Sequence, residues 1–409
     1  MSKKPFRPSA DFLKAIPKTD LHVHLGGSLR LSTLIDFAKK QNVDLPSYTE
    51  SGLMETVFKK QYSGLAEYLK AFYYTHRVMR DPESLEQIAY ELAWDNFNEG
   101  VRYIEIRFAP QLNAHRNFTL EQVLATVHKG LERAQKEIHR SAGIASGKEP
   151  PFEFGIIGCA MRKFHEKFSD YFHDFIKIHC HTPLKELYPI ASLELARALV
   201  EARDSLGLPV VGFDLAGEEK GWPAEDHKAS FDFAHKNFLN KTVHAGEAFG
   251  PPSIFQAVTD LHADRIGHAT HLFATEDIDA TDPKAKRKYL DGLVQYLGER
   301  RITIEVCLTS NLQTIPSLTS ISDHPAKKML EHNLSVTFCT DNRLVSQTTV
   351  CNEIAMAQKH FQLDQKRLKD IIIYGFKRSF FPKSYREKRA YVYQVIDYYE
   401  AMEKKYLVG

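Results

Sequence analysis

The chain has 409 residues, of which 43% are hydrophobic and 26% are charged, so it is long enough to bury a large core. Its 54 Lys and Arg residues nearly balance its 52 Asp and Glu residues, which gives a formal net charge of +2. This balance excludes the basic excess that is typical of nucleic-acid binding and the acidic excess that would attract a cationic partner.

Short apolar runs that are typical of strands alternate with helical patterns along the chain. The predicted strands are 19–25, 101–108, 154–161, 210–215, 242–244, 265–268, 302–307 and 336–340. The predicted helices are 29–40, 85–99, 119–142, 192–205 and 390–406. About eight strands alternating with helices favour a closed (β/α)8 TIM barrel, of the α/β class, over an open sheet. The first strand is not followed by GxGxxG, which weakens a dinucleotide-binding fold further.

Two of the predicted helices carry specific end signals. Gly100 stands at the C′ position after the helix at 85–99, and Thr119 is placed to cap the helix at 119–142. The stretch 140–152 is the best candidate for a linker but is short, and 274–290 has the composition of a polar insertion. We therefore expect residues 1–409 to form a single barrel domain with extra helices and insertions.

The cysteine content and the hydropathy pattern bear on the compartment. The five cysteines are an odd number and form no CxxC pair, which is typical of a reducing environment. Residues 1–11 lack an apolar signal-peptide core, and no stretch reaches the roughly 18 apolar residues of a membrane span. We expect a cytoplasmic protein with no membrane partner and no nucleic-acid partner.

Four short patches, each at the carboxyl end of a predicted strand, offer ligands for a metal ion. They are His22-Val23-His24, His244-Ala245-Gly246-Glu247, Ile266-Gly267-His268 and Thr340-Asp341-Asn342. The carboxyl ends of parallel barrel strands meet on one face, so these distant patches can converge there. Because side-chain direction alternates along a strand, both imidazoles of the first patch point to the same side. Histidine and carboxylate ligands suit Zn²⁺ with an open position for water, although Fe and Mn accept the same ligands.

Several of these residues have structural alternatives. Asp341 follows a buried-type strand, where a carboxylate is costly unless it is paired or bound to metal. Glu247 can serve as a proton donor if its pKa is raised, or simply as an acidic residue at a helix N-terminus. His268 can be a ligand, a general base or a hydrogen-bonded core histidine.

The chain resembles adenosine deaminases, which belong to the metal-dependent hydrolase superfamily of (β/α)8 barrels. The matching stretches are PKTDLHVHLGGSL (17–29), LAEYLKAFYYTH (65–76), YIEIRFAP (103–110), DLAGEE (214–219), VHAGE (243–247), RIGH (265–268) and CTDN (339–342). HxH alone is common among metal hydrolases. HAGE together with DLAGEE is much more specific to the adenosine and AMP deaminase branch.

The resemblance implies zinc-dependent hydrolytic deamination of adenosine, and of 2′-deoxyadenosine, to inosine and ammonia. It implies one Zn²⁺ per chain, held by His22, His24, His244 and Asp341. Glu247 would be the protonated acid at purine N1, and His268 would help to deprotonate the attacking water. The expected partner is a small purine nucleoside, and the expected assembly is a monomer or a small homo-oligomer.

The resemblance also implies the contacts of the substrate. The backbone N–H of Gly217 would meet purine N3. Asn342 stands where the family usually has a second Asp facing N7, and its NH₂ group can still donate there. Gly26 replaces an Asp that usually contacts the ribose 5′-hydroxyl, which leaves the 5′ end open. Residues that match the apolar lid over the ribose, or that simply form a helix core, are Leu65, Tyr68, Leu69 and Phe72.

Three rival functions follow from these departures. The first is a deaminase of another aminopurine, such as a 5′-modified adenosine, AMP or adenine, because Gly26 leaves the 5′ contact undefined. AMP would need a basic pocket, to which Arg30 or Arg162 could contribute. A binuclear amidohydrolase would need a carbamylated lysine, for which Lys163 is the candidate, but HAGE does not fit that class. An inactive binding protein is disfavoured because the expected catalytic residues are all present.

Overall fold

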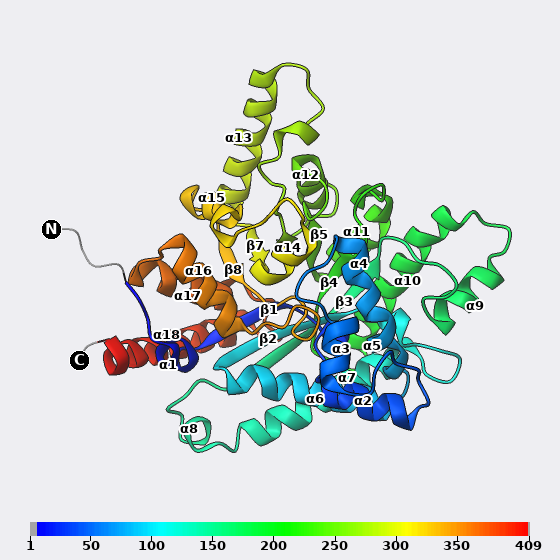
Figure 1. Ribbon diagram of the computed structural model, residues 1–409, viewed down its shortest axis with the longest axis horizontal. Helices are drawn as coiled ribbons and strands as arrows, with labels where there is room; N and C mark the ends of the chain where they lie inside the picture. Colours follow the sequence, from blue (N-terminus) through cyan, green and yellow to red (C-terminus); the bar gives the residue numbers. More distant parts are fainter. Residues whose placement is uncertain (1–5, 408–409) are drawn as a thin grey trace.

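The computed structural model describes residues 6–407, and its centre is a sheet of eight parallel strands in the order β1 to β8 (Figure 1). The strands are β1 (Lys18–His24), β2 (Val101–Phe108), β3 (Glu153–Met161), β4 (Val210–Ala216), β5 (Asn240–Ala245), β6 (Arg265–His268), β7 (Thr303–Val306) and β8 (Val336–Phe338). A parallel bridge between Val23 and Asp341 brings the segment after β8 against β1. The predicted (β/α)8 barrel is therefore confirmed.

Helices surround this barrel and connect its strands. They are α1 (Ala10–Ala15), α2 (Leu31–Lys40), α3 (Glu50–Thr56), α4 (Leu65–Tyr68), α5 (Phe72–Val78), α6 (Pro82–Asn98), α7 (Leu120–Ile138), α8 (Ala142–Ala145), α9 (Asp170–Ile178), α10 (Leu184–Asp204), α11 (Lys228–Lys236), α12 (Pro251–Thr259), α13 (Pro283–Arg300), α14 (Leu308–Thr314), α15 (Ala326–Glu331), α16 (Val350–Phe361), α17 (Gln365–Arg378) and α18 (Tyr385–Leu407). Within residues 6–407, none of these helices has the length and the apolar character needed to cross a membrane.

The helix-end signals that the sequence predicts are present. Gly100 has φ 91° just beyond the end of α6, a conformation that favours glycine. Thr119 and Gln122 form a capping box at the start of α7, which stabilises a helix by about 1 kcal/mol. Both signals are local, and this explains why the sequence alone reveals them.

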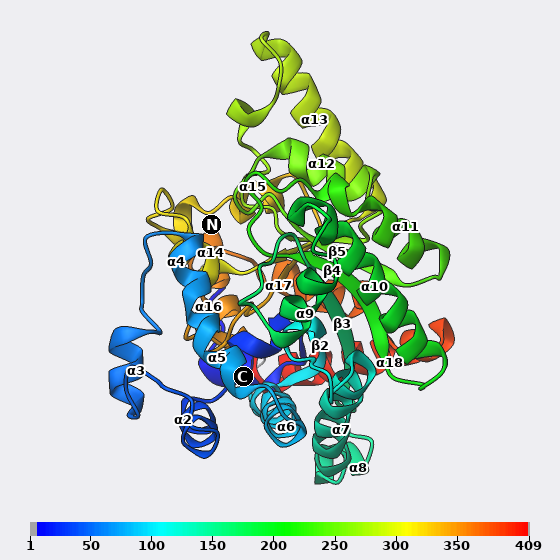
Figure 2. The same cartoon turned by 90° about the vertical axis from the view of Figure 1, so that its right-hand side faces the viewer.

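Helix α10 and the polar stretch 274–290 differ from the prediction. Helix α10 begins at Leu184, eight residues before the predicted start, and continues through Pro189. The expected polar insertion contains the first half of α13, which starts with Asp282 as N-cap and Pro283 in its first turn. Figures 1 and 2 both show α13 projecting away from the barrel. Residues 283–289 of α13 are exposed or only partly buried, so this half of the helix shows weak apolar periodicity in the sequence.

Two short helices and the turn between them lie next to the carboxyl end of β1. Helix α4 contacts α14, and α5 contacts the 3₁₀ turn η1 (Leu25–Gly27) that directly follows β1. Figure 2 shows α4 beside α14. The segment 65–78, called the lid segment below, therefore lies along the carboxyl end of the barrel between the segments that follow β7 and β1.

Candidate active site

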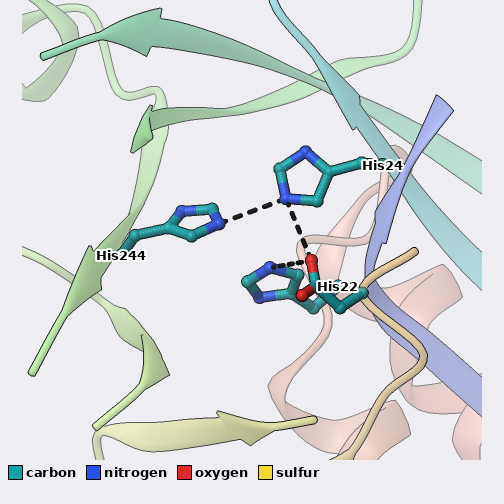
Figure 3. A group of neighbouring side chains, drawn as sticks. His22, His24 and His244 are labelled. Carbon is teal, nitrogen blue, oxygen red and sulfur yellow. Dashed lines mark hydrogen bonds and ion pairs between the residues drawn. The ribbon is translucent and has the colours of Figure 1, made fainter. Parts of the chain in front are cut away.

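Three histidine rings and one carboxylate meet at the carboxyl end of the barrel (Figure 3). The Nε2 atoms of His24 and His244 are 3.1 Å apart, and Asp341 Oδ1 lies 3.5 Å from His22 Nε2 and 3.4 Å from His24 Nε2. A tetrahedral zinc ion with bonds of about 2.05 Å requires ligand atoms about 3.3 Å apart. Among the described residues, the buried Nε2 of His22 has no hydrogen-bond partner. The donor set and its spacing therefore fit a zinc ion.

Two buried carboxylates orient the ligand rings. The Nδ1–H of His22 donates to Glu305 over 2.8 Å, and the Nδ1–H of His244 donates to Asp214 over 3.0 Å. Arg107 pairs with both carboxylates, at 2.8 Å from Glu305 and 3.2 Å from Asp214. Burial opposes ionisation of Asp214, but the charges of His244 and Arg107 hold its pKa below the ordinary value. Because Nδ1 of each ring is bound to a carboxylate, each ring turns its Nε2 towards the metal position.

Asp341 reaches the site from a strained backbone position. Its φ is 59°, a left-handed conformation that is uncommon for Asp and costs about 1–2 kcal/mol. Hydrogen bonds to β1 hold it there: its N–H donates to His22 O over 2.8 Å, and its carbonyl accepts from the N–H of His24 over 2.7 Å. Ser310 also donates to Asp341 Oδ2 over 2.5 Å. These bonds turn the carboxylate towards the histidines.

Glu247 lies in a buried loop after β5 that a second glutamate holds in place. The carboxylate of Glu219 accepts the backbone N–H groups of Gly246, Glu247, Ala248 and Phe249 at 2.6–3.1 Å. Burial raises the pKa of Glu247 to about 8, although the charge of His244 acts in the opposite direction. The Glu247 carboxyl is therefore protonated at neutral pH and can act as an acid.

His268 completes this cluster from the end of β6. Its Nε2 lies 3.8 Å from Glu247 Oε1, and its ring centre is 4.8 Å from that of His22. A Cβ atom on Gly267 would lie 3.0 Å from His22 Cε1, so glycine lets the two strands place both rings in the site. All six side chains predicted as ligands or catalytic groups thus lie in one cluster, and what each does there remains a prediction.

Asn342 faces the lid segment. Its Nδ2 donates to the hydroxyl of Tyr68 over 2.8 Å, and that hydroxyl also bonds Ser346 at 2.7 Å. The second hydrogen of Nδ2 is left for another acceptor. Tyr68 is buried, while the other predicted lid residues are partly buried against the core; they are Leu65, Leu69 and Phe72. The predicted lid residue Tyr68 therefore contributes a polar contact as well as apolar area.

The space beside Gly26 is filled by His76 of α5. A Cβ atom at position 26 would lie 2.7 Å from Cε1 and 3.0 Å from Nε2 of His76. The imidazole stacks on Phe72, and its buried Nδ1 has no partner among residues 6–407. Burial, helped by the charge of Arg80, lowers the pKa of His76 to about 4, so the ring is neutral. Gly217, the remaining predicted substrate contact, follows β4 with φ 101°.

The side chains that the rival functions would require are already bound to other groups of the protein. Arg30 is exposed and pairs with Asp95 at 2.6 Å. The buried guanidinium of Arg162 donates to the carbonyls of Trp222 and His244. The predicted phosphate role of these two arginines therefore gains no support. Lys163 pairs with Glu218 at the surface.

Comparison with known proteins decides the family. The family model described as adenosine deaminase matches residues 17–398. The chain belongs to the adenosine deaminase family. An adenosine deaminase of Mycobacterium avium is 33% identical over 386 residues, which cover 94% of this chain and 95% of that one. The prediction that the chain is a hydrolytic deaminase is confirmed.

Solved structures show the same fold at lower identity. The adenine deaminase of Arthrobacter aurescens has a TM-score of 0.71 and 21% identity, and the match covers 94% of this chain and 100% of that one. The N6-methyl-AMP deaminase of Arabidopsis thaliana has a TM-score of 0.71 and 22% identity, with 95% and 98% covered. At this identity the two neighbours support the barrel and not a particular substrate.

Sequence reasoning did not identify the buried charged residues that hold the histidine rings and the Glu247 loop in place. These are Arg107, Asp214, Glu219 and Glu305. A signal was present, because Arg107 and Glu305 stand inside apolar runs that become fully buried strands. A charged residue in such a run must be paired or bound, so it marks a buried polar network.

Proposed function

We propose that this chain, acting as a single barrel domain, deaminates adenosine and 2′-deoxyadenosine to inosine and ammonia with one Zn²⁺ bound. One observation carries the proposal: the protonated carboxyl of Glu247 lies beside a four-ligand set that fits zinc. A metal site alone would suit many hydrolases. A buried acid next to it suits a reaction in which a ring nitrogen must be protonated.

The residues divide the reaction between them. Zinc in this ligand set would lower the pKa of a bound water from 15.7 toward about 7. Addition of water at C6 removes the aromaticity of the six-membered ring and makes N1 strongly basic. Glu247 carries the proton that N1 takes up, and the burial of its carboxyl group keeps bulk water away from it. Asn342 and the Gly217 N–H orient the purine. The hydroxyl proton of the C6 adduct passes to the amino group, the C6–N bond breaks, and ammonia leaves with the 6-oxo product remaining.

A second candidate, a 5′-modified adenosine, is favoured by the contact between Gly26 and His76. The family's Asp is absent, and a neutral imidazole occupies the place of its side chain. A neutral imidazole can donate to or accept from a hydroxyl, but it lacks the positive charge that a phosphate requires. This supports a 5′-hydroxyl or an uncharged 5′ substituent over AMP.

The decisive experiment compares substrates side by side. Zinc-replete protein is assayed on adenosine, 2′-deoxyadenosine, 5′-methylthioadenosine, AMP and adenine, following the loss of absorbance at the adenine band. We expect the highest kcat/KM on adenosine, and one zinc per chain by metal analysis. A higher value on another purine would replace the proposed substrate, and two metals per chain would favour a binuclear amidohydrolase. Zinc binding without turnover of any purine would favour an inactive binding protein.

A further inference from the structure

A chain of hydrogen bonds leads from the start of α15 to the ring of His268. The backbone N–H of Ala326 donates to His324 Nδ1 over 3.0 Å. His324 Nε2 lies 3.2 Å from Asn311 Oδ1, and Asn311 Nδ2 lies 3.0 Å from His268 Nδ1. The side chains of Asn311, His324 and His268 are at most 1% exposed. These three side chains are therefore shielded from water, which cannot replace their hydrogen bonds to one another.

The first bond sets the direction of all the others. A backbone N–H can only donate, so Nδ1 of His324 must be unprotonated and its single proton must lie on Nε2. Burial also lowers the pKa of His324 to about 3, which agrees with a neutral ring. Its Nε2–H needs an acceptor, and this places the oxygen of the Asn311 amide towards it. The NH₂ group of the same amide then faces His268.

An NH₂ group at this position determines which nitrogen of His268 is protonated. Facing a donor, Nδ1 of His268 must keep its lone pair, so the proton of the neutral ring lies on Nε2. If the amide were reversed, its NH₂ group would face the Nε2–H of His324, and two donors would meet. If both nitrogens of His268 were protonated, Nδ1–H would face the NH₂ group of Asn311, and again two donors would meet. Each alternative also leaves a buried polar group unpaired, which costs about 1–3 kcal/mol.

We propose that Asn311 and His324 are positioning residues that hold His268 as the tautomer protonated on Nε2, so that His268 donates a hydrogen bond into the site. The proposal rests on the proposed deamination and deepens it. It makes His268 a hydrogen-bond donor in the site. The expectation from the sequence is the reverse, that His268 helps to remove a proton from water. As a donor, His268 orients the attacking oxygen and stabilises the negative charge that develops on it.

The matched substitution is Asn311→Asp, which keeps the shape of the side chain and removes its only donor. The carboxylate accepts from His324 as before, but it now also requires a proton on His268 Nδ1. We expect kcat to fall about 10²-fold, as when one donor to a developing oxyanion is removed, with zinc content unchanged. Asn96→Asp, which introduces a carboxylate at another fully buried asparagine, is the control and should stay within about twofold.

The direct readout is the tautomer of His268 in zinc-loaded protein labelled with ¹⁵N-histidine. Its signals are assigned by their loss in His268→Gln, and proton-coupled ¹⁵N spectra report which nitrogen carries the proton. We expect Nε2 in the wild type and Nδ1 in Asn311→Asp. A proton on Nδ1 of the wild type would overturn the proposal, whether or not the variant folds.

This readout separates the proposal from the proposed function. If no purine is deaminated but His268 carries its proton on Nε2, the proposed function fails and the hydrogen-bond chain stands. If adenosine is deaminated and the proton lies on Nδ1, the proposed function stands and the positioning role of Asn311 and His324 fails. His324→Phe provides a second variant, because without a partner for its oxygen the Asn311 amide is free to turn. We expect both tautomers of His268 in that variant, and an unchanged tautomer would count against His324.

Discussion

Burial favours the acid role proposed for Glu247, because it keeps the carboxyl group protonated. Its raised pKa of about 8 means that the protonated, active form is present below pH 8 and is lost as pH rises through that value. We therefore expect kcat to be flat near neutral pH and to fall tenfold per pH unit above about 8. The measurement is kcat for adenosine between pH 6 and 10 in zinc-replete protein.

The variant Glu247→Gln tests the same residue without changing its size. An amide has no proton to give at N1, so we expect turnover to fall by about 10²–10⁴-fold while the zinc content stays at one per chain. His22→Ala is the complementary variant, because it should lose zinc. A kcat of Glu247→Gln within tenfold of the wild-type kcat would show that Glu247 is not the acid.

At the scale of single residues, the sequence predicts the side chains of the site better than their surroundings. The ligand types and the patch positions are visible because each patch follows a strand-like run, as with His22 and Asp341. The position of His76 beside Gly26 could not be predicted. It depends on how α5 packs against the turn after β1, and no local pattern encodes this contact.

At the scale of elements, the lid segment is tied to the barrel by the hydroxyl of Tyr68. Removing it in Tyr68→Phe deletes the bonds to Asn342 and Ser346, each worth about 0.5–1.5 kcal/mol. In the proposed function these bonds would hold the lid segment over the substrate, so we expect KM for adenosine to rise about 3–10-fold and kcat to change less. Steady-state kinetics of the purified variant provide the measurement.

Tyr73→Phe is the matched control for the lid. Tyr73 lies on the same segment, is 59% exposed, and its hydroxyl contacts only Arg77 among the described residues. We expect no change in KM for this variant. Equal effects of the two substitutions would show that the Tyr68 hydroxyl has no special part in holding the lid.

The elements themselves were predicted to different degrees. Strand β2 and helix α7 could be placed within a few residues, because strong apolar periodicity and caps mark them. Strand β8 is only three residues long, shorter than the predicted run 336–340, because the chain turns towards the site before Asp341. Tertiary contacts with β1 set that boundary, and such contacts leave no local signal.

At the scale of the whole molecule, the metal ion would link the first strand, the fifth strand and the segment after the last strand at the carboxyl end of the barrel. A ligand that binds only the folded chain adds about 2.7 kcal/mol of stability at a concentration one hundred times its Kd. We therefore expect chelation to lower the unfolding temperature by several degrees, and added zinc to restore it. Differential scanning calorimetry before and after reloading measures this effect.

The control for metal-linked stability is His24→Ala, which lacks one ligand. Its unfolding temperature should respond weakly to zinc or to chelator. If the wild type shows no response either, the cluster does not hold the ion in the folded protein. A response of the same size in both proteins would place the bound zinc elsewhere.

The spread of the ligands along the chain has a consequence for biosynthesis. A ribosome adds roughly 5–20 residues per second, so about 15 to 65 s separate the translation of His24 from that of Asp341. The first two imidazoles thus leave the exit tunnel long before the final carboxylate exists. A polypeptide released early would keep most of its strands and still be unable to coordinate the ion fully. Full coordination of the proposed ion would therefore require a nearly finished chain.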